Sequence, residues 1–342
     1  MELQTIWFFL WGLLWALFFM TDGFDFGVGM LYPFLGKNES EKAVMRHSLG
    51  PVWDGNEVWL IAAGGVTFAA FPPVYSVMFS SLYSALMLIL FALILRGVSF
   101  EFQNQVDHPA WRQVWDVCIF VGSLVPALLF GVAFANIFSG IPIGEDGVSY
   151  VTLFSLLNGY GLLGGLLFVS LFLVHGALWL TVRTEGDLQR RADRVARTTW
   201  AVLLAVAVVF LVASAYATDL YANYLAYPIL FILVILDVAA LVAIRYFLRL
   251  AAYFKAWIAS ALTIVLCTFF GVVGLFPNLF PSSVSPEYSL TAFNASSSPL
   301  TLTIMLVVVL IFVPIVVAYQ VWTYRLFTDK ISESELACED AY

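Results

Sequence analysis

Long apolar runs separated by short polar clusters dominate this sequence. The runs lack the alternation of apolar and polar positions that a membrane-spanning β-strand shows. They therefore predict transmembrane helices, because a helix needs about 20 mostly apolar residues to cross the hydrocarbon core of a bilayer. We expect about nine such helices, at 5–27, 53–71, 75–95, 114–137, 152–180, 198–217, 228–248, 256–276 and 300–326.

The composition of the chain supports lipid as its solvent. The 342 residues are 62% hydrophobic and 11% charged, whereas soluble domains are about half apolar and a quarter charged. The first apolar run lacks a basic segment before it and a small-residue cleavage site after it, so we expect a retained helix. No motif resembles a phosphate-binding loop, and we expect no nucleic-acid partner.

The basic residues indicate the orientation of the helices. All 15 fall in alternate connections or after the last helix, and the remaining connections carry only acidic charges. Because cytoplasmic loops are enriched in Lys and Arg, we expect an outside N-terminus, a cytoplasmic C-terminus and an odd number of spans. The basic residues are Lys37, Lys42, Arg46, Arg96, Arg112, Arg183, Arg190, Arg191, Arg194, Arg197, Arg245, Arg249, Lys255, Arg325 and Lys330.

The spacing of the runs predicts four segments. Residues 1–137 would hold a first bundle of four helices, and residues 138–276 a second. An outer loop and a peripheral ninth helix would follow at 277–327, and an acidic cytoplasmic tail at 328–342. The fold class is therefore an all-α polytopic membrane protein.

A band of ionisable groups marks the cytoplasmic ends of the first three predicted helices. Asp22 and Asp25 are three residues apart and share a helix face. A charged group deep in a span costs at least about 2.5–3.5 kcal/mol, so such groups pair with one another or line a wet path. The candidate site residues are Asp22, Asp25, Trp53, Asp54, Glu57, Arg96 and Glu101.

Two interpretations of this band remain open from the residues alone. In the structural one, Asp54 caps its helix, and Asp22 and Asp25 hold three helices together through Arg96. In the functional one, the carboxylates carry protons or ions. Asp237 differs, because it lies in mid-span without an evident basic partner; a neutral side chain or a partner in another subunit would satisfy it.

The histidines and cysteines argue against a redox centre within this chain. Of His47, His108 and His175, only His175 lies inside a predicted span, so no pair of axial haem ligands is evident. The three cysteines, Cys118, Cys267 and Cys338, show no paired spacing, and no metal-ligand cluster stands out. We expect no catalytic residue, no metal site and no haem in this chain.

Several long motifs stand out in this chain: TDGFDFGVGML, GPVWDGNEVWLIAAGGVTFAAFPPVY, LRGVSFEF, HGALWLTVRTEGDLQRRA, FPNLFPSSVSPEYSLTAFNASSSPLTLTIML and VWTYRLF. Together they resemble subunit II of the cytochrome bd-type quinol oxidases. The resemblance covers nearly the whole chain in the same order. One departure follows the third motif, where many relatives have a basic residue and this chain has Gln103.

This resemblance implies a non-haem subunit of a terminal oxidase in the bacterial inner membrane. The family oxidises quinol and reduces oxygen to water as part of the respiratory electron-transport chain. The haems, b and d, and the quinol site would lie in the partner, subunit I, which would form a heterodimer with this chain. A small single-helix accessory subunit, membrane lipids and a structural quinone are further expected partners.

The resemblance also gives the ionisable band a role. Asp25, Asp54 and Arg96, with Trp53, match positions that the family associates with proton uptake from the cytoplasm. Two alternatives remain: a proton-coupled secondary transporter, which broken helices and inverted repeats would favour, and a purely structural assembly subunit. No role is carried over for Asp237.

Overall fold

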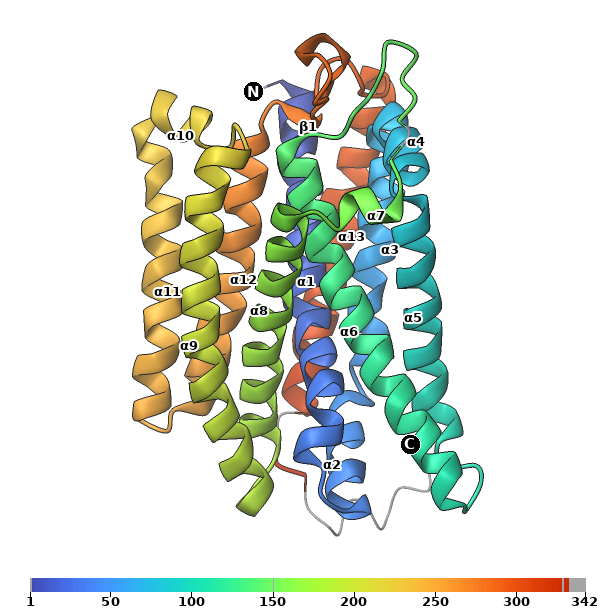
Figure 1. Ribbon diagram of the computed structural model, residues 1–342, viewed down its shortest axis with the longest axis vertical. Helices are drawn as coiled ribbons and strands as arrows, with labels where there is room; N and C mark the ends of the chain where they lie inside the picture. Colours follow the sequence, from blue (N-terminus) through green and yellow to red (C-terminus); the bar gives the residue numbers. More distant parts are fainter. Residues whose placement is uncertain (1, 150, 328, 332–342) are drawn as a thin grey trace.

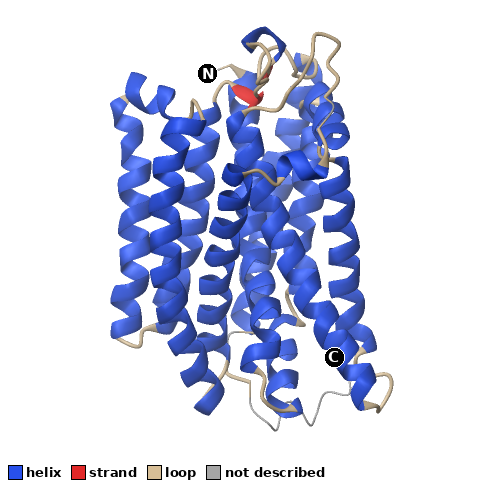
Figure 2. Cartoon of the chain, in the orientation of Figure 1, coloured by secondary structure: helices blue, strands red, loops and turns tan. Residues whose placement is uncertain are grey.

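The protein is a bundle of long helices that run along one common direction (Figures 1 and 2). The computed structural model describes residues 2–149, 151–327 and 329–331, so nearly all of the predicted acidic tail lies outside the described residues. The larger helices are α1 (Leu3–Leu35), α3 (Trp53–Ala70), α5 (Tyr83–Phe102), α6 (Pro109–Ser139), α8 (Gly159–Arg183), α9 (Gly186–Ala217), α11 (Phe231–Arg249), α12 (Tyr253–Leu275) and α13 (Pro299–Leu326).

Short elements close the two ends of the bundle. At the end that holds α2 lie also the α5–α6 and α8–α9 connections and the α11–α12 turn, whereas α4, α7 and α10 lie toward the other end (Figure 1). β1 and β2 form a small antiparallel pair at that second end. The short elements are α2 (Glu39–Leu49), α4 (Pro72–Ser81), α7 (Leu153–Leu156), α10 (Tyr221–Ala226), η1 (Pro228–Leu230), η2 (Pro286–Tyr288), β1 (Asn278–Phe280) and β2 (Leu290–Thr291).

The helices confirm a membrane protein with many spans. Within the described part of the chain, 8 helices are long and apolar enough to cross a bilayer. The helix α3 is not among these, since the polar residues Asp54, Asn56 and Glu57 lower the mean hydropathy of its 18 residues. It nevertheless packs along α1 between the two ends of the bundle.

Several helices are longer than the apolar runs predict. The first extends to Leu35 rather than 27, so Asp22 and Asp25 lie well inside it. The helix α9 begins at Gly186 rather than 198. Its polar first part includes an ion pair between Asp193 and Arg197, at positions i and i+4. Hydropathy identifies the part of a helix in lipid, whereas backbone hydrogen bonding continues through polar residues beyond the hydrocarbon core.

Two predicted spans are interrupted. The span 152–180 begins with the short α7 (Leu153–Leu156) and continues from Gly159 as α8. The span 75–95 also differs. It is divided into α4 and α5 at Leu82, whose backbone is not helical (φ −96, ψ 12). The run of apolar residues continues across this position, so hydropathy alone shows no break. Pro72 and Pro73 start α4, because proline fits the first turn of a helix and no later one without loss of a hydrogen bond.

α1 is the central helix, and it contacts α3, α6, α8 and α12. Its inward surface is rich in aromatic rings that pack edge to face, such as Trp15 against Phe134 at 5.1 Å between ring centroids. Gly27 permits close contact with α8, since a Cβ atom there would lie 1.9 Å from the carbonyl oxygen of Phe172. Membrane helices associate mainly by such close packing, because lipid tails are as apolar as the side chains.

Candidate functional site

A buried ion cluster joins α1, α3 and α5. The Arg96 side chain is fully buried, and its Nη2 donates to both carboxylate oxygens of Asp22, at 2.8 and 3.0 Å. The same nitrogen donates to Glu57 Oε1. The Arg96 Cζ also lies 4.3 Å from the centroid of the Phe26 ring, a cation–π contact that offsets part of the cost of burial. One guanidinium therefore neutralises charge from two other helices.

Asp25 belongs to a second network that reaches α13. Asn56 Nδ2 donates to Asp25 Oδ2 at 2.7 Å. Asn56 Oδ1 in turn accepts from the Tyr324 hydroxyl at 2.7 Å and from Gln320 Nε2 at 3.2 Å. Trp59 Nε1 donates to Gln320 Oε1 at 2.9 Å. Sequence reasoning missed Gln320 and Tyr324, although two polar residues four apart in an apolar helix are a readable signal of a shared polar contact.

Some polar atoms of these networks have no protein partner. Among the described residues, no group hydrogen-bonds to Asp25 Oδ1, to Arg96 Nε or to Arg96 Nη1, although all three atoms are buried. Buried polar groups in folded proteins are generally hydrogen-bonded to protein or to water. Asp25 thus combines one fixed oxygen with one that can bind a water molecule or a proton.

Three of the predicted site residues lie outside the buried cluster. Asp54 is exposed on the first turn of α3, and Glu101 is exposed near the end of α5. Val52 is the N-cap residue of α3, and no side-chain hydrogen bond from it caps the helix. Trp53 packs against Phe100 of α5, with 5.4 Å between ring centroids. The structure therefore brings together Asp22, Glu57 and Arg96, places Asp25 in the network of Asn56, and leaves Asp54 and Glu101 on the surface.

A second polar cluster, also missed from sequence, surrounds Gln103. Gln103 is buried and donates to Asp116 Oδ1. Lys42 of α2 pairs with the other oxygen of Asp116 at 2.5 Å, and Arg46 donates to the buried Tyr32 hydroxyl at 2.5 Å. Burial alone would lower the pKa of Lys42, but Asp116 outweighs it and the pKa is raised. Asp116 thus contacts both the neutral Gln103, at the C-cap of α5, and the cation Lys42 of α2.

His175 and Asp237 have different surroundings. His175 Nδ1 is bonded to Ser260 Oγ at 2.6 Å and Nε2 to the Met20 carbonyl oxygen at 3.0 Å. Both ring nitrogens are thus used, so the residue does not fit an axial haem ligand. Asp237 Oδ1 is buried without a hydrogen-bond partner in the described part of the chain. The described residues also contain no group of three His, Cys, Asp or Glu side chains that could hold a metal ion.

The fold and the ion cluster together define a class of protein. The protein is a polytopic helical membrane protein with buried ion pairs that join α1, α3 and α5. Its chain matches the family model described as cytochrome bd terminal oxidase subunit II over residues 3–327. The protein therefore belongs to the family of cytochrome bd oxidase subunit II, a component of an oxidoreductase complex in the bacterial inner membrane.

Individual relatives agree with this family. The chain is 38% identical over 336 residues to cytochrome bd ubiquinol oxidase subunit 2 of Bacillus subtilis, covering 98% of both chains. It is 36% identical over 367 residues to cytochrome bd-I ubiquinol oxidase subunit 2 of Escherichia coli K12, covering 98% of this chain and 96% of the relative. These matches confirm the resemblance predicted from the motifs.

A solved structure shares the fold. A chain in the structure of bd oxidase from Geobacillus thermodenitrificans aligns with a TM-score of 0.79 at 17% sequence identity, covering 96% of this chain and 99% of that chain. At this identity the likeness supports the fold alone. Membership of the family implies a partner subunit I.

Proposed function

We propose that the chain crosses the membrane nine times, with its N-terminus outside and its C-terminus in the cytoplasm. The proposal adds α3 to the 8 helices that meet the length and hydropathy criteria. The grouping of the segments rich in Lys and Arg at the α2 end supports it, because positive charge marks the cytoplasmic side. The ion pair between Arg191 and Glu41, at 2.7 Å, joins two of those segments directly.

In the same proposal, residues 1–137 and 138–276 form two four-helix bundles, 277–327 an outer loop with peripheral α13, and 328–342 a cytoplasmic tail. The chain supports assembly of subunit I, which carries haems b and d and the quinol site. The exposed acids Asp54 and Glu101 support a partner at the α3 and α5 surface, since charges on a membrane helix are costly when they face lipid.

Non-protein partners are also proposed. A cavity of about 370 Å³ lies among α1, α3, α8, α12 and α13, and it is lined by Phe24, Trp59, Trp179 and Trp257. Its size and aromatic lining suit a structural quinone or a lipid tail. A single-helix accessory subunit would find broad apolar surfaces on α9, α11 and α13.

The main functional proposal is that this subunit delivers protons from the cytoplasm. Reduction of oxygen to water consumes protons, and a path through low dielectric needs groups that exchange them. Asp54 would be the surface entry, beside Trp53, and Asp25 the buried acceptor, with Arg96 stabilising negative charge. The observation that carries this proposal is the Asp25 carboxylate, fully buried with one oxygen held by Asn56 and the other unpartnered among the described residues.

Asp22 and Glu57 have a different part in this proposal. Their carboxylates bond directly to Arg96, so they fix the guanidinium and the three helices rather than exchange protons. The pairing also supports the alternative of a purely structural subunit. A substitution that keeps the fold distinguishes this alternative from proton delivery. A transporter is not favoured, since none of the described helices that carry these acids is interrupted at them.

Asp54→Asn in the complete oxidase is the test. The variant keeps side-chain size and lies on an exposed turn, so we expect normal assembly, an unchanged haem spectrum and oxygen consumption reduced by about tenfold or more. Asp107→Asn, whose side chain in the wild type is 94% exposed on the same side, is the matched control and should keep full turnover. Full turnover of an assembled Asp54→Asn complex would exclude the proposed entry role. Loss of assembly would favour the structural alternative.

A further inference from the structure

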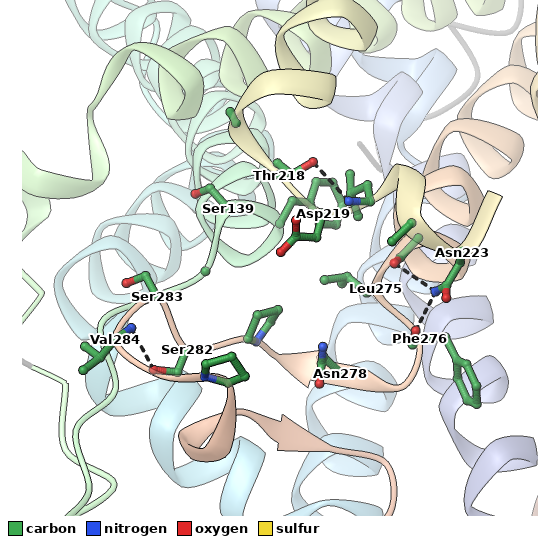
Figure 3. A pocket seen from close by; sticks show the side chains of 18 of the residues that line it. Ser139, Thr218, Asp219, Asn223, Leu275, Phe276, Asn278, Ser282, Ser283 and Val284 are labelled. Atoms are coloured by element: carbon green, nitrogen blue, oxygen red, sulfur yellow. Dashed lines mark hydrogen bonds between the residues drawn. The ribbon is translucent and has the colours of Figure 1, made fainter. Parts of the chain in front are cut away.

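A polar pocket opens at the end of the bundle opposite α2. Its volume is about 510 Å³, and it lies between the ends of α6, α9 and α12 and the loop at 281–286. Figure 3 shows the Asp219 side chain pointing into this space, with Asn278 and Ser283 on the opposite wall. The volume falls within the range of small-molecule sites, which is about 300–1,000 Å³, and far exceeds that of a single ion.

The electrostatics of the pocket favour a cation. Among the described residues that line the pocket, Asp219 is the only charged one, and none is Lys or Arg. Three helices end at the pocket with their carboxyl termini, at Ser139, Ala217 and Leu275. Each helix end of this polarity carries roughly half a negative charge. A ligand with a net negative charge would therefore be repelled, whereas a positive group near Asp219 would be attracted.

The Asp219 carboxylate is not used by the fold. It is exposed, and no hydrogen bond or ion pair of its side chain is present among the described residues. By contrast, Asn223 in the same wall is structural, since its Nδ2 donates to the carbonyl oxygens of Gly274 and Phe276, at 3.1 and 2.5 Å. The Asn223 amide therefore satisfies carbonyl groups at the end of α12, whereas the Asp219 carboxylate is available to a ligand.

The walls of the pocket are both polar and apolar. Ser139, Asn278 and Ser283 offer hydroxyl and amide groups, and Phe138 and Leu275 offer apolar surface. At its edge, Tyr216 in the last turn of α9 is 89% exposed, the position at which tyrosine anchors a helix in the interfacial region of a bilayer. A ligand here can therefore reach the pocket from the membrane surface.

We propose that this pocket binds a primary ammonium group on a phosphorylated, polar headgroup, with the ammonium at Asp219. Phosphatidylethanolamine of the outer leaflet is one source of this chemistry, and free glycerophosphoethanolamine is the soluble one. Asn278 and Ser283 would donate to the phosphate, which needs hydrogen-bond donors where no cation is present. One carboxylate with neutral neighbours does not suit a divalent metal ion, which takes several oxygen ligands including carboxylates.

The test uses the complete two-subunit oxidase after removal of bound lipid. Thermal unfolding is followed with added phosphatidylethanolamine, with phosphatidylglycerol, which lacks the ammonium, and with glycerophosphoethanolamine. We expect the ethanolamine lipid to raise the unfolding midpoint more than the glycerol lipid does. Asp219→Asn should abolish this difference and weaken binding by about twofold to fivefold, the size of one partly exposed ion pair. Glu145→Gln, an exposed acid at the same end but outside the pocket, should behave as wild type.

Native mass spectrometry provides the second readout. Ser283→Phe adds bulk at an exposed pocket wall without removing a helix contact, so it should also reduce retained phosphatidylethanolamine if Asp219→Asn assembles poorly. Equal stabilisation by the free headgroup and the lipid would support the ammonium site with a soluble ligand. Equal stabilisation by the two lipids in the wild type, or an unchanged preference in both variants, would overturn the proposal.

Discussion

Asp22 and Asp25 lie three residues apart on one face of α1, yet the tertiary structure gives them different partners. Asp22 bonds to Arg96 through both oxygens, whereas Asp25 bonds to the neutral Asn56. Removing one member of a buried ion pair costs about 3–5 kcal/mol, because the other charge stays buried. Replacing Asp25 with a neutral amide leaves no such charge behind.

These environments predict opposite phenotypes for two equivalent substitutions. We expect Asp22→Asn to lower the yield and thermal stability of the complex, since Arg96 loses its bidentate partner. We expect Asp25→Asn to assemble with near-normal stability and to lose most of its oxygen consumption. Measurements of complex yield, unfolding midpoint and turnover for both variants test this contrast. Similar stability loss in both variants would contradict the distinction.

At the scale of elements, α2 is fastened to the bundle by ion pairs to two helices. Lys42 contacts Asp116 of α6, and Glu41 contacts Arg191 of α9 at 2.7 Å. Burial alone would raise the pKa of Glu41, but the hydrogen bonds from Arg191 and from the Lys37 amide outweigh it. The pKa is therefore lowered from its ordinary value of 4.5.

A lowered pKa in the folded state predicts a pH-dependent contribution to stability. The ionised carboxylate stabilises the fold above its unfolded-state pKa, and this contribution is lost as the pH falls through the folded-state pKa. Glu41→Gln should therefore cost about 0.5–1 kcal/mol near neutral pH and progressively less as the pH falls below the ordinary value. Unfolding midpoints across pH measure this. Glu39→Gln, whose side chain is 51% exposed in the wild type, should show a smaller effect, and a pH-independent loss would argue against the ion pair.

α13 is the element most dependent on specific polar contacts. Most of its surface is exposed, and of its described residues only Leu302 is fully buried. Gln320 and Tyr324 nevertheless bond to Asn56 of α3, so this helix is connected to the same network as Asp25. A helix with little packing of its own can thus influence the buried carboxylate.

At the scale of the whole molecule, the proposed orientation places the α2 end in the cytoplasm. Single cysteines at Glu145 and Arg190, in a background without Cys118, Cys267 and Cys338, test this directly. Both positions are exposed, and the Arg190 side chain is 74% exposed. An impermeant thiol reagent applied to intact cells should label the cysteine at 145 and leave the one at 190 unlabelled until the cells are opened. The reverse pattern would refute the orientation.

The sequence by itself determined the features that follow from local composition. Apolar runs predicted a helical membrane protein, because transfer of side chains into lipid depends on each segment alone. The motifs predicted the family, which the matches confirm. Hydropathy could not find the ends of α1 and α9 or the break at Leu82, because helix continuation depends on hydrogen bonding and packing rather than on polarity.

Only the tertiary structure decided which polar groups meet. Asp22, Glu57 and Arg96 come from three helices, and Tyr324 reaches Asn56 across 268 residues of chain. The Asp219 pocket likewise forms from the ends of three helices and a distant loop. Helical spacing tells which residues share a face of one helix, whereas the rotation and crossing of the helices, set by close contacts such as that of Gly27 with α8, determine which faces oppose one another.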